Sequence, residues 1–289
     1  MRMTFNDDAN VGGSKARRRG AGVAIAGGGV VGVGALAVLL LNLLTGGDFS
    51  ALLGGSDASG QGDPIPACTT GAQANADDTC RLSAASVVID QFWADRVDGY
   101  VRPGLTIVDG STSSPCGTAS NQTGPFYCPS DETVYIDPTF FALLRDRFGA
   151  SGGELAQMYV LAHEYGHHVQ NITGAMERHP ADGTGATSNG VRTELQADCY
   201  AGAWIANAAQ QTDPNGVHYL KTPTQAQIRD ALNAAASVGD DHIQQEAGVG
   251  VNPESWTHGS SAQRERWFEN GYDGGVVACD TFAVAGSSL

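Results

Sequence analysis

The segment from Glu154 to Ile172 constrains the fold more than any other part of this chain. Its first half, Leu155 to Leu161, is largely apolar, as expected for a buried helix, and its second half reads Ala-His-Glu-Tyr-Gly-His-His. If the segment is one helix, His163 and His167 lie one turn apart on a common face, and Glu164 leans toward the same edge. We therefore expect three polar side chains to be held together inside the protein.

The spacing H-E-x-x-H has a specific chemical meaning. The two imidazoles bind Zn²⁺, and the glutamate takes a proton from the water that attacks a carbonyl group. The alternative is that these side chains are solvated and their spacing is accidental. Polar groups embedded in a buried helix need a partner such as a metal ion, so the sequence favours a zinc site at His163 and His167, with Glu164 as the base.

Two histidines leave zinc short of ligands, so the chain must supply a third group. The elongated form of the motif is excluded, because Gln170 and Thr173 stand where its glycine and third histidine would be. Glu194, in the helical stretch 189–210, would complete a His, His, Glu set with one position open. Asp198, one turn further on, could accept a hydrogen bond from a ligand histidine and orient it. The alternative, a solvated pair of acids, is disfavoured by the apolar neighbours.

Two other histidines compete less well for this role. His179 is the rival third ligand, but it lies in a polar loop just before Pro180. His168 is rotated by about 100° from His167 around the helix and should point elsewhere.

The charge balance limits the class of partner. The chain has 289 residues, with 16 basic and 31 acidic side chains, and beyond residue 19 there are 11 basic and 29 acidic ones. Such a surface repels phosphate backbones. We therefore expect no nucleic-acid partner.

The N-terminal region resembles a membrane anchor. Residues 1–19 are polar and end in Lys15-Ala16-Arg17-Arg18-Arg19, whereas residues 20–47 carry no charge. That length suits a transmembrane helix better than the shorter core of a cleaved signal peptide, which is the alternative. Basic residues before a span hold the N-terminus in the cytoplasm. We therefore predict a cytoplasmic tail (1–19), a single transmembrane helix (20–47), a flexible linker rich in Gly and Ser (48–66) and an extracytoplasmic domain (67–289).

Six cysteines test this topology, and all of them follow the predicted span. An even number outside the membrane indicates three disulfides in an oxidising compartment, although buried free thiols are an alternative. The sequence alone does not choose among the connectivities. Local closure favours two short-range pairs and leaves one long-range pair: Cys68 with Cys80, Cys116 with Cys128, and Cys199 with Cys279.

The remaining segments indicate an α+β fold that is mainly helical. Helical spacing predicts helices at 84–97, 139–148 and 222–237, and a further helix that opens near Thr257. Residues 100–130 are broken by Gly and Pro and predict loops with short extended pieces. Thr133 to Ile136 predicts a strand. It is either the edge strand that pairs with an extended peptide in zinc peptidases, or an ordinary core strand.

Several motifs together resemble the bacterial, membrane-anchored family named "putative neutral zinc metallopeptidase". The resemblance runs from about residue 66 to 283 and implies a zincin-like fold with a small sheet. It also implies that His163, His167 and Glu194 bind zinc and that Glu164 is the base. The motifs that carry it are HEYGHHVQ from His163, VRTELQADCYAG from Val191, ESWTHG from Glu254, QRERWF from Gln263, GPFYCP from Gly124 and VYID from Val134.

The segment Thr257 to Arg264 has a second similarity. It resembles the Thr-His-Pro segment followed by an arginine in membrane-linked peptidases with the same zinc ligands. His258 or the arginine could bind the developing oxyanion. Alternatively, His258 caps the helix or bonds a backbone carbonyl, and Arg264 and Arg266 pair with acids on the domain.

Taken together, these patterns predict zinc-dependent hydrolysis of peptide bonds in the cell envelope, with a peptide or protein as substrate. Two alternatives stay open at this stage. One is a non-catalytic envelope module that zinc stabilises, although such a site has no use for Glu164 as a base. The other is a metal-dependent amidase that acts on cell-wall peptides by the same carbonyl chemistry.

Overall fold

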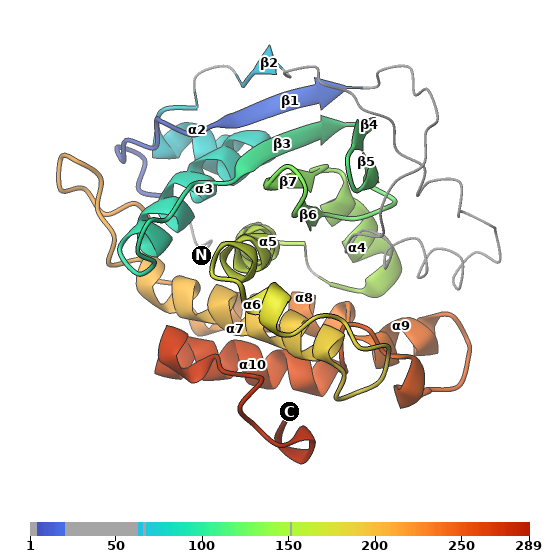
Figure 1. Ribbon diagram of the computed structural model, residues 1–289. Helices are drawn as coiled ribbons and strands as arrows, with labels where there is room; N and C mark the ends of the chain where they lie inside the picture. Colours follow the sequence, from blue (N-terminus) through green and yellow to red (C-terminus); the bar gives the residue numbers. More distant parts are fainter. Residues whose placement is uncertain (1–4, 21–62, 66–67, 151) are drawn as a thin grey trace.

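The protein folds as a mixed sheet covered by helices. A computed structural model describes residues 5–20, 63–65, 68–150 and 152–289 (Figure 1). The five-stranded sheet has the order β2-β1-β3-β7-β6, and β4 and β5 form a separate hairpin. The strands are β1 (Ala16–Gly20), β2 (Asp63–Pro64), β3 (Gly104–Asp109), β4 (Ser111–Ser114), β5 (Gly117–Ser120), β6 (Phe126–Cys128) and β7 (Thr133–Ile136).

Helices make up most of the remaining structure. Single 3-10 turns lie at Pro253–Ser255, Val276–Ala278 and Gly286–Ser288. The α-helices are α2 (Gly71–Ala76), α3 (Asp78–Ala94), α4 (Phe140–Phe148), α5 (Glu154–Ile172), α6 (Ala175–Arg178), α7 (Asn189–Ala208), α8 (Gln225–Ser237), α9 (Asp240–Glu246) and α10 (Ser261–Gly274).

Helix α5 lies at the centre, between the sheet and the layer formed by α7, α8 and α10 (Figure 1). Two glycines let the helices approach closely. A Cβ atom on Gly166 of α5 would lie 3.0 Å from the Cα atom of Ala197 on α7. A Cβ atom on Gly271 of α10 would overlap the carbonyl oxygen of Cys199 on α7, at 1.8 Å. The three helices therefore pack backbone against backbone around the metal-binding motif.

The N-terminal segment Phe5 to Gly20 belongs to this domain. Strand β1 runs parallel to β3 over five residue pairs, and Arg18 lies opposite both Ile107 of β3 and Asp63 of β2. Upstream of β1, the side chain of Phe5 is 1% exposed. The backbone N–H of Asn6 donates to the carbonyl of Tyr219 at 2.9 Å. These contacts connect the segment to the sheet and to the loop before α8.

The predicted division of the chain put residues 1–19 in a tail separate from the domain at 67–289, whereas residues 16–20 pair with β3 of that domain. The end of the predicted linker is also ordered, as strand β2. Residues 21–47 of the predicted transmembrane helix lie outside the described residues. Within the part that is described, no helix is both long enough and apolar enough to span a bilayer.

Most of the other predicted elements agree with the structure. The helix at 154–172 and the strand at 133–136 are confirmed at their predicted bounds, as α5 and β7. The helix predicted at 84–97 begins earlier, at Asp78, because Asp77 caps it by accepting from the N–H of Cys80. Strand β7 lies between β3 and β6, so it is a core strand, and β6 is one of the two edge strands of the described sheet.

The three disulfides have the predicted connectivity. Cys68 pairs with Cys80, and Cys116 pairs with Cys128, in both cases across a separation of 12 residues. The long-range pair Cys199–Cys279 joins α7 to the segment that follows α10. This third disulfide fixes the C-terminal region against the helix that carries Glu194.

Candidate metal centre

Two rows of polar side chains run along α5. His163, His167 and Gln170 are spaced i, i+4, i+7 and form what we call the metal row. Glu164, His168 and Asn171 have the same spacing one residue later and form what we call the strand row. Residues at this spacing share one face of a helix. The metal row faces α7, and the strand row faces β6.

The metal row and Glu194 of α7 bring three potential ligand atoms together. The Nε2 atoms of His163 and His167 are 3.2 Å apart. Glu194 places one carboxylate oxygen 3.2 Å from the His163 Nε2 atom and the other 3.5 Å from the His167 Nε2 atom. A tetrahedral zinc site with bonds of about 2.0–2.2 Å has ligand–ligand edges of about 3.3–3.6 Å. The separation of the two nitrogens, and the distance from each nitrogen to one of the two carboxylate oxygens, are therefore close to the edges of such a site.

The tautomers of the two histidines support a cation at this point. The Nδ1 atom of His163 lies 2.8 Å from a carboxylate oxygen of Asp198, and that of His167 lies 2.9 Å from the amide oxygen of Gln170. Both partner atoms are acceptors, so each Nδ1 carries the proton. The Nε2 atoms then face each other and the Glu194 carboxylate. Burial lowers the pKa of His163, but Asp198 and Glu194 outweigh it and raise the pKa to about 10. These acids therefore favour a positive charge at this point, which a bound cation would supply, and among the described residues this is the group that could hold a metal ion.

Gln170 was not predicted as part of the site. Its amide nitrogen donates to the carbonyl of Thr193 at 2.8 Å and to the side-chain oxygen of Gln196 at 3.1 Å. These bonds orient the amide oxygen toward His167 and fix α5 against α7. The sequence could have indicated the contact between Gln170 and His167, because Gln170 lies three residues after His167 on the same helical face.

Asp198 is fixed by a buried arginine. The carboxylate is fully buried, accepts from Nδ1 of His163, and receives two further hydrogen bonds, at 2.8 and 2.9 Å, from Arg264 of α10. The hydroxyl of Tyr159 also donates to it. Burial alone would raise the pKa of Asp198, but Arg264 and His163 outweigh it and lower the pKa to about 2. Asp198 therefore remains an anion that holds His163 in one orientation, as predicted, and Arg264 pairs with an acid inside the site.

Glu164 lies beside the ligand group and is 7% exposed. Desolvation raises the pKa of its carboxyl group, against lowering effects from His163, His167 and the backbone amide of Tyr127. A raised pKa suits a base that must accept a proton and then release it. Glu164 directly follows His163 along α5.

His258 approaches the site from the loop before α10. Asp240 of α9 accepts hydrogen bonds from three successive backbone N–H groups, those of Thr257, His258 and Gly259, at 2.7, 2.6 and 3.0 Å. It also lies 3.3 Å from the Nδ1 atom of His258. Burial lowers the pKa of His258, but Asp240 and Glu194 outweigh it and raise the pKa above its usual value. His258 is therefore held by an acid, Asp240, a contact that none of the sequence alternatives included.

The other candidates lie outside the ligand group. His179 stacks on the ring of Phe282, with centroids 3.9 Å apart. His168 points away from the ligands, and its Nδ1 atom lies 3.1 Å from the hydroxyl of Tyr127. Arg266 donates to a main-chain oxygen of Leu289, whereas the sequence alternative expected an acidic side chain.

Comparison with known proteins supports this reading of the site. Residues 4–282 match the family described as "Putative neutral zinc metallopeptidase". The chain belongs to this family. Because the match begins at residue 4, the family's shared region includes the N-terminal segment that the structure packs on the domain.

Relatives in this family occur in distant bacteria. An uncharacterized protein of Mycobacterium tuberculosis is 47% identical over 250 residues, which cover 86% of this chain and 85% of that protein. The uncharacterized protein YpfJ of Escherichia coli is 38% identical over 265 residues, which cover 87% of each chain. No solved structure matches the chain.

Proposed function

We propose that the protein is a zinc-dependent peptidase with His163, His167 and Glu194 as zinc ligands. The observation that carries this proposal is the convergence of His163, His167 and Glu194. The two ring nitrogens lie 3.2 Å apart, and they lie 3.2 and 3.5 Å from the two carboxylate oxygens, with Glu164 next to His163 on α5. A zinc site that only stabilised a fold would close its fourth position with another protein ligand. A His, His, Glu set beside a buried carboxylate instead leaves room for water and substrate.

Each residue of the site has a separate role in the proposed reaction. Zinc, when bound, supplies a Lewis acid for the scissile carbonyl and lowers the pKa of a water to about 7. Glu164 accepts the proton of the attacking water and returns it to the leaving amine. Asp198 keeps the His163 ring in one tautomer, and Gln170 does the same for His167. His258, whose pKa Asp240 helps to raise, donates to the oxyanion.

The fold supports a zincin-like architecture. The motif helix α5 lies under a mixed sheet, the third ligand comes from the following helix α7, and β6 forms an edge of the sheet beside α5. An extended peptide could pair with such an edge by backbone hydrogen bonds. We assign this role to β6, because β7 is paired on both sides.

The test uses the purified protein with its disulfides intact. We expect it to bind one zinc ion per chain, to cleave members of an unbiased peptide library, and to lose this activity with a chelator until zinc is restored. Glu164→Gln should keep the zinc and lose cleavage by about 10²–10⁴-fold. Wild-type turnover in that variant would refute the assignment of the base. Zinc without any cleavage would favour a binding module.

We also propose that the domain works in an oxidising compartment outside the cytoplasm. The structure brings all six cysteines into three disulfides, and such bonds are rare where thiols are kept reduced. We infer that the N-terminal segment lies on the same side, because Arg18 lies in one sheet with Asp63 and Ile107.

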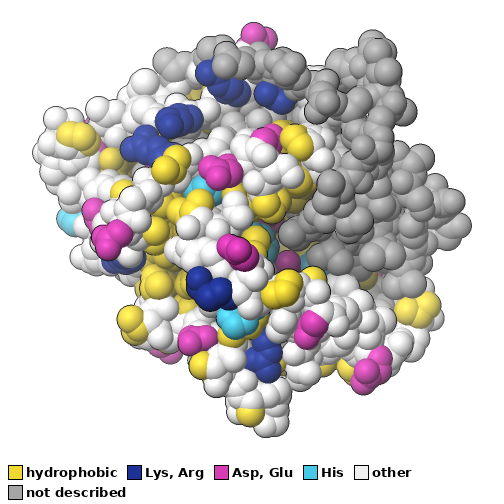
Figure 2. All heavy atoms as spheres, in the orientation of Figure 1, with side chains coloured by type: hydrophobic (Ala, Val, Ile, Leu, Met, Phe, Trp, Pro, Cys, Tyr) yellow, Lys and Arg dark blue, Asp and Glu magenta, His cyan; other side chains and the backbone are white. Residues whose placement is uncertain are grey.

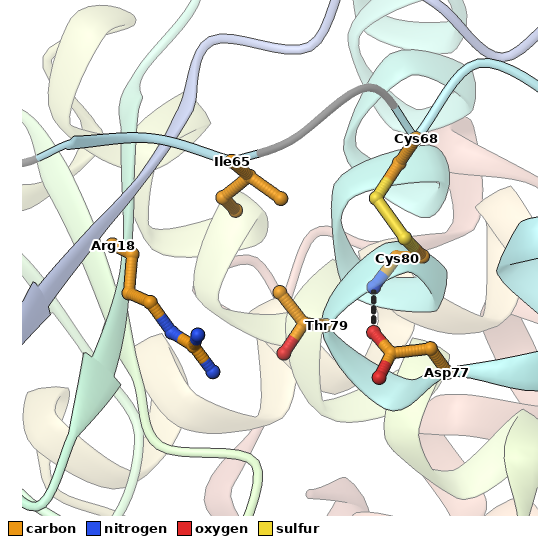
Figure 3. Close-up of a pocket in the computed structure, with 6 residues that line it drawn as sticks. All are labelled: Arg18, Ile65, Cys68, Asp77, Thr79 and Cys80. Atoms are coloured by element: carbon orange, nitrogen blue, oxygen red, sulfur yellow. Dashed lines mark hydrogen bonds between the residues drawn. A yellow bond between two sulfur atoms is a disulfide. The ribbon is translucent and has the colours of Figure 1, made fainter.

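The surroundings of β1 illustrate this arrangement. Exposed basic side chains gather over β1 (Figure 2), and Lys15, Arg17 and Arg18 are the exposed cations of that segment. Figure 3 shows Arg18 lining one pocket together with the Cys68–Cys80 disulfide. Basic residues before an apolar segment favour the cytoplasm. The disulfides and the shared sheet favour a location outside the cytoplasm. We give the three disulfides more weight than the preference of basic residues for the cytoplasmic side.

Labelling with a membrane-impermeant maleimide tests the location. Lys15→Cys places a thiol on the exposed side of the N-terminal segment, and Val277→Cys places one on the domain, at a side chain that is 93% exposed. In intact spheroplasts we expect both variants to be labelled equally. Labelling at residue 277 together with protection at residue 15 until lysis would overturn the shared location.

A further inference from the structure

We propose that Gln196 is a positioning residue that connects the disulfide-bound C-terminal segment, residues 279–289, to the metal row. This inference rests on the proposed assignment of His167 as a zinc ligand. The connection is a series of three hydrogen bonds. The Nδ1 atom of His167 donates to the amide oxygen of Gln170 at 2.9 Å. The amide nitrogen of Gln170 donates to the amide oxygen of Gln196 at 3.1 Å. The amide nitrogen of Gln196 donates to the carbonyl of Cys279 at 2.9 Å.

The three hydrogen bonds run in one direction, which the last acceptor sets. A backbone carbonyl can only accept, so the amide nitrogen of Gln196 faces Cys279 and its oxygen faces Gln170. That oxygen requires the amide nitrogen of Gln170, which leaves the oxygen of Gln170 for His167. The carbonyl of Thr193 favours the same orientation, because it also accepts from the amide nitrogen of Gln170, at 2.8 Å. The Nδ1 atom of His167 therefore carries the proton, and Nε2 is the atom that can bind zinc.

The disulfide holds this last acceptor against α7. Cys199 lies three residues after Gln196, so both side chains extend from one face of α7 toward the C-terminal segment. There they meet the same residue, because Cys279 is bonded to Cys199 through its sulfur and accepts from Gln196 through its carbonyl. Gln196, Cys199 and Cys279 are 7%, 0% and 1% exposed, so water competes little for these contacts. A buried, fully paired series of this kind favours one arrangement of its amides.

The consequence is that zinc affinity depends on a segment distant in sequence from α5. Without the amide of Gln196, the amide nitrogen of Gln170 keeps only the carbonyl of Thr193 as a partner. Gln170 then restrains the ring of His167 less firmly. We expect weaker zinc binding but not its loss, because the three ligands are still present. The net contribution of one hydrogen bond corresponds to about a two- to tenfold change in an equilibrium constant.

The experiment compares Gln196→Met with Gln211→Met. Methionine has a similar length to glutamine and removes both hydrogen-bonding groups. Gln211 is a matched control, because it is also buried, at 8% exposed, and its amide nitrogen also donates to a backbone carbonyl, that of Val88, at 2.9 Å. In competition with a chromophoric chelator, we expect zinc affinity to fall about two- to tenfold in Gln196→Met and to stay at the wild-type value in Gln211→Met. Equal affinities in both variants would overturn the proposal.

Removal of a disulfide tests whether the C-terminal segment acts through Gln196. We expect Cys199→Ala/Cys279→Ala to lower zinc affinity and Cys68→Ala/Cys80→Ala, which removes the disulfide at the start of α3, to leave it unchanged. Gln196→Met should then cause little further loss in the protein that lacks the Cys199–Cys279 disulfide, because both changes act on the same contact. Fully additive losses would show that the two act independently and would overturn the connection.

The side-chain amide of Gln170, followed by NMR, provides a readout that depends on neither zinc nor activity. In the metal-free protein with its disulfides intact, we expect both amide protons of Gln170 to exchange slowly with water. In Gln196→Met one of them should exchange faster, and unchanged exchange would overturn the proposal. If the wild type cleaves nothing but the affinity and exchange results hold, the positioning stands and the peptidase assignment fails.

Discussion

The metal row and the strand row lie side by side on α5 but are held by different partners. His163 and His167 turn their outer nitrogens to acceptors, Asp198 of α7 and Gln170 of α5. His168 instead accepts at Nδ1 and donates at Nε2, so both of its nitrogens are used by protein groups. The same residue type is therefore a proposed metal ligand in one row and, one position further along the helix, a structural link in the other.

This difference teaches that a histidine's second partner decides its role. A ring that donates through Nδ1 presents the lone pair of Nε2 to a metal, whereas a ring that donates through Nε2 to a carbonyl does not. Variants in the two rows should therefore differ in zinc content. Variants in the metal row lose zinc and activity together, and variants in the strand row keep zinc.

The largest expected effect is in the metal row. His167→Ala removes one ligand and the partner of Gln170. We expect the purified variant to hold no zinc after dialysis against a chelator and to show no cleavage above background. His168→Asn, its neighbour in the strand row, should retain one zinc ion per chain. Zinc loss in His168→Asn equal to that in His167→Ala would break the distinction between the rows.

Substitution of Arg264 should have a smaller effect, a decrease in zinc affinity. Arg264→Met leaves Asp198 without its bidentate partner, so the carboxylate holds His163 less firmly. We expect zinc affinity to fall about 10–100-fold, measured by competition with a chromophoric chelator. Arg266→Met is the matched control, because Arg266 bonds the C-terminal residue instead. Equal affinities in the two variants would remove Arg264 from the site.

His258 tests whether turnover depends on groups outside α5. His258→Gln removes the proposed oxyanion donor and no zinc ligand. We expect kcat to fall about 10²-fold with zinc content unchanged. If the loss falls on zinc content instead, His258 belongs functionally with the metal row.

Substitution of Asp240 should produce the smallest effect, a shift in the pH dependence of kcat. Asp240 helps to raise the pKa of His258, so protonated His258 persists to higher pH in the wild type. Activity that needs this proton is present at low pH and is lost as pH rises through the raised pKa. In Asp240→Asn the alkaline limb of the kcat profile should therefore move to lower pH. A limb that stays in place would show that His258 does not titrate in turnover.

Much of the site could be predicted because its parts are local. His163, Glu164 and His167 lie within one turn of one helix, and helical spacing alone brings them together. Glu194 was reached by chemistry, because two histidines need a third ligand and a buried helix offered a carboxylate. Asp240 was missed because the predicted helix ended at residue 237 and no further helix was expected directly after it, whereas α9 begins at Asp240.

The N-terminal strand shows why the rest could not be predicted. Its partner β3 lies far along the chain, and no local pattern encodes that pairing. Exposed Arg17 and Arg18 gave the segment the composition of a tail. Charged side chains are nevertheless common near sheet edges, where they discourage pairing with other chains. Burial of Phe5 and Val11 was also not visible from two isolated apolar residues in a polar stretch.

X-ray absorption spectroscopy of the zinc-loaded protein tests the central claim most directly. We expect a site with nitrogen and oxygen ligands at about 2.0–2.2 Å, with two imidazoles and no sulfur. In Glu194→Gln the carboxylate contribution should be lost while both imidazoles remain. Sulfur at about 2.3 Å, or a wild-type spectrum with fewer than two imidazoles, would contradict the account.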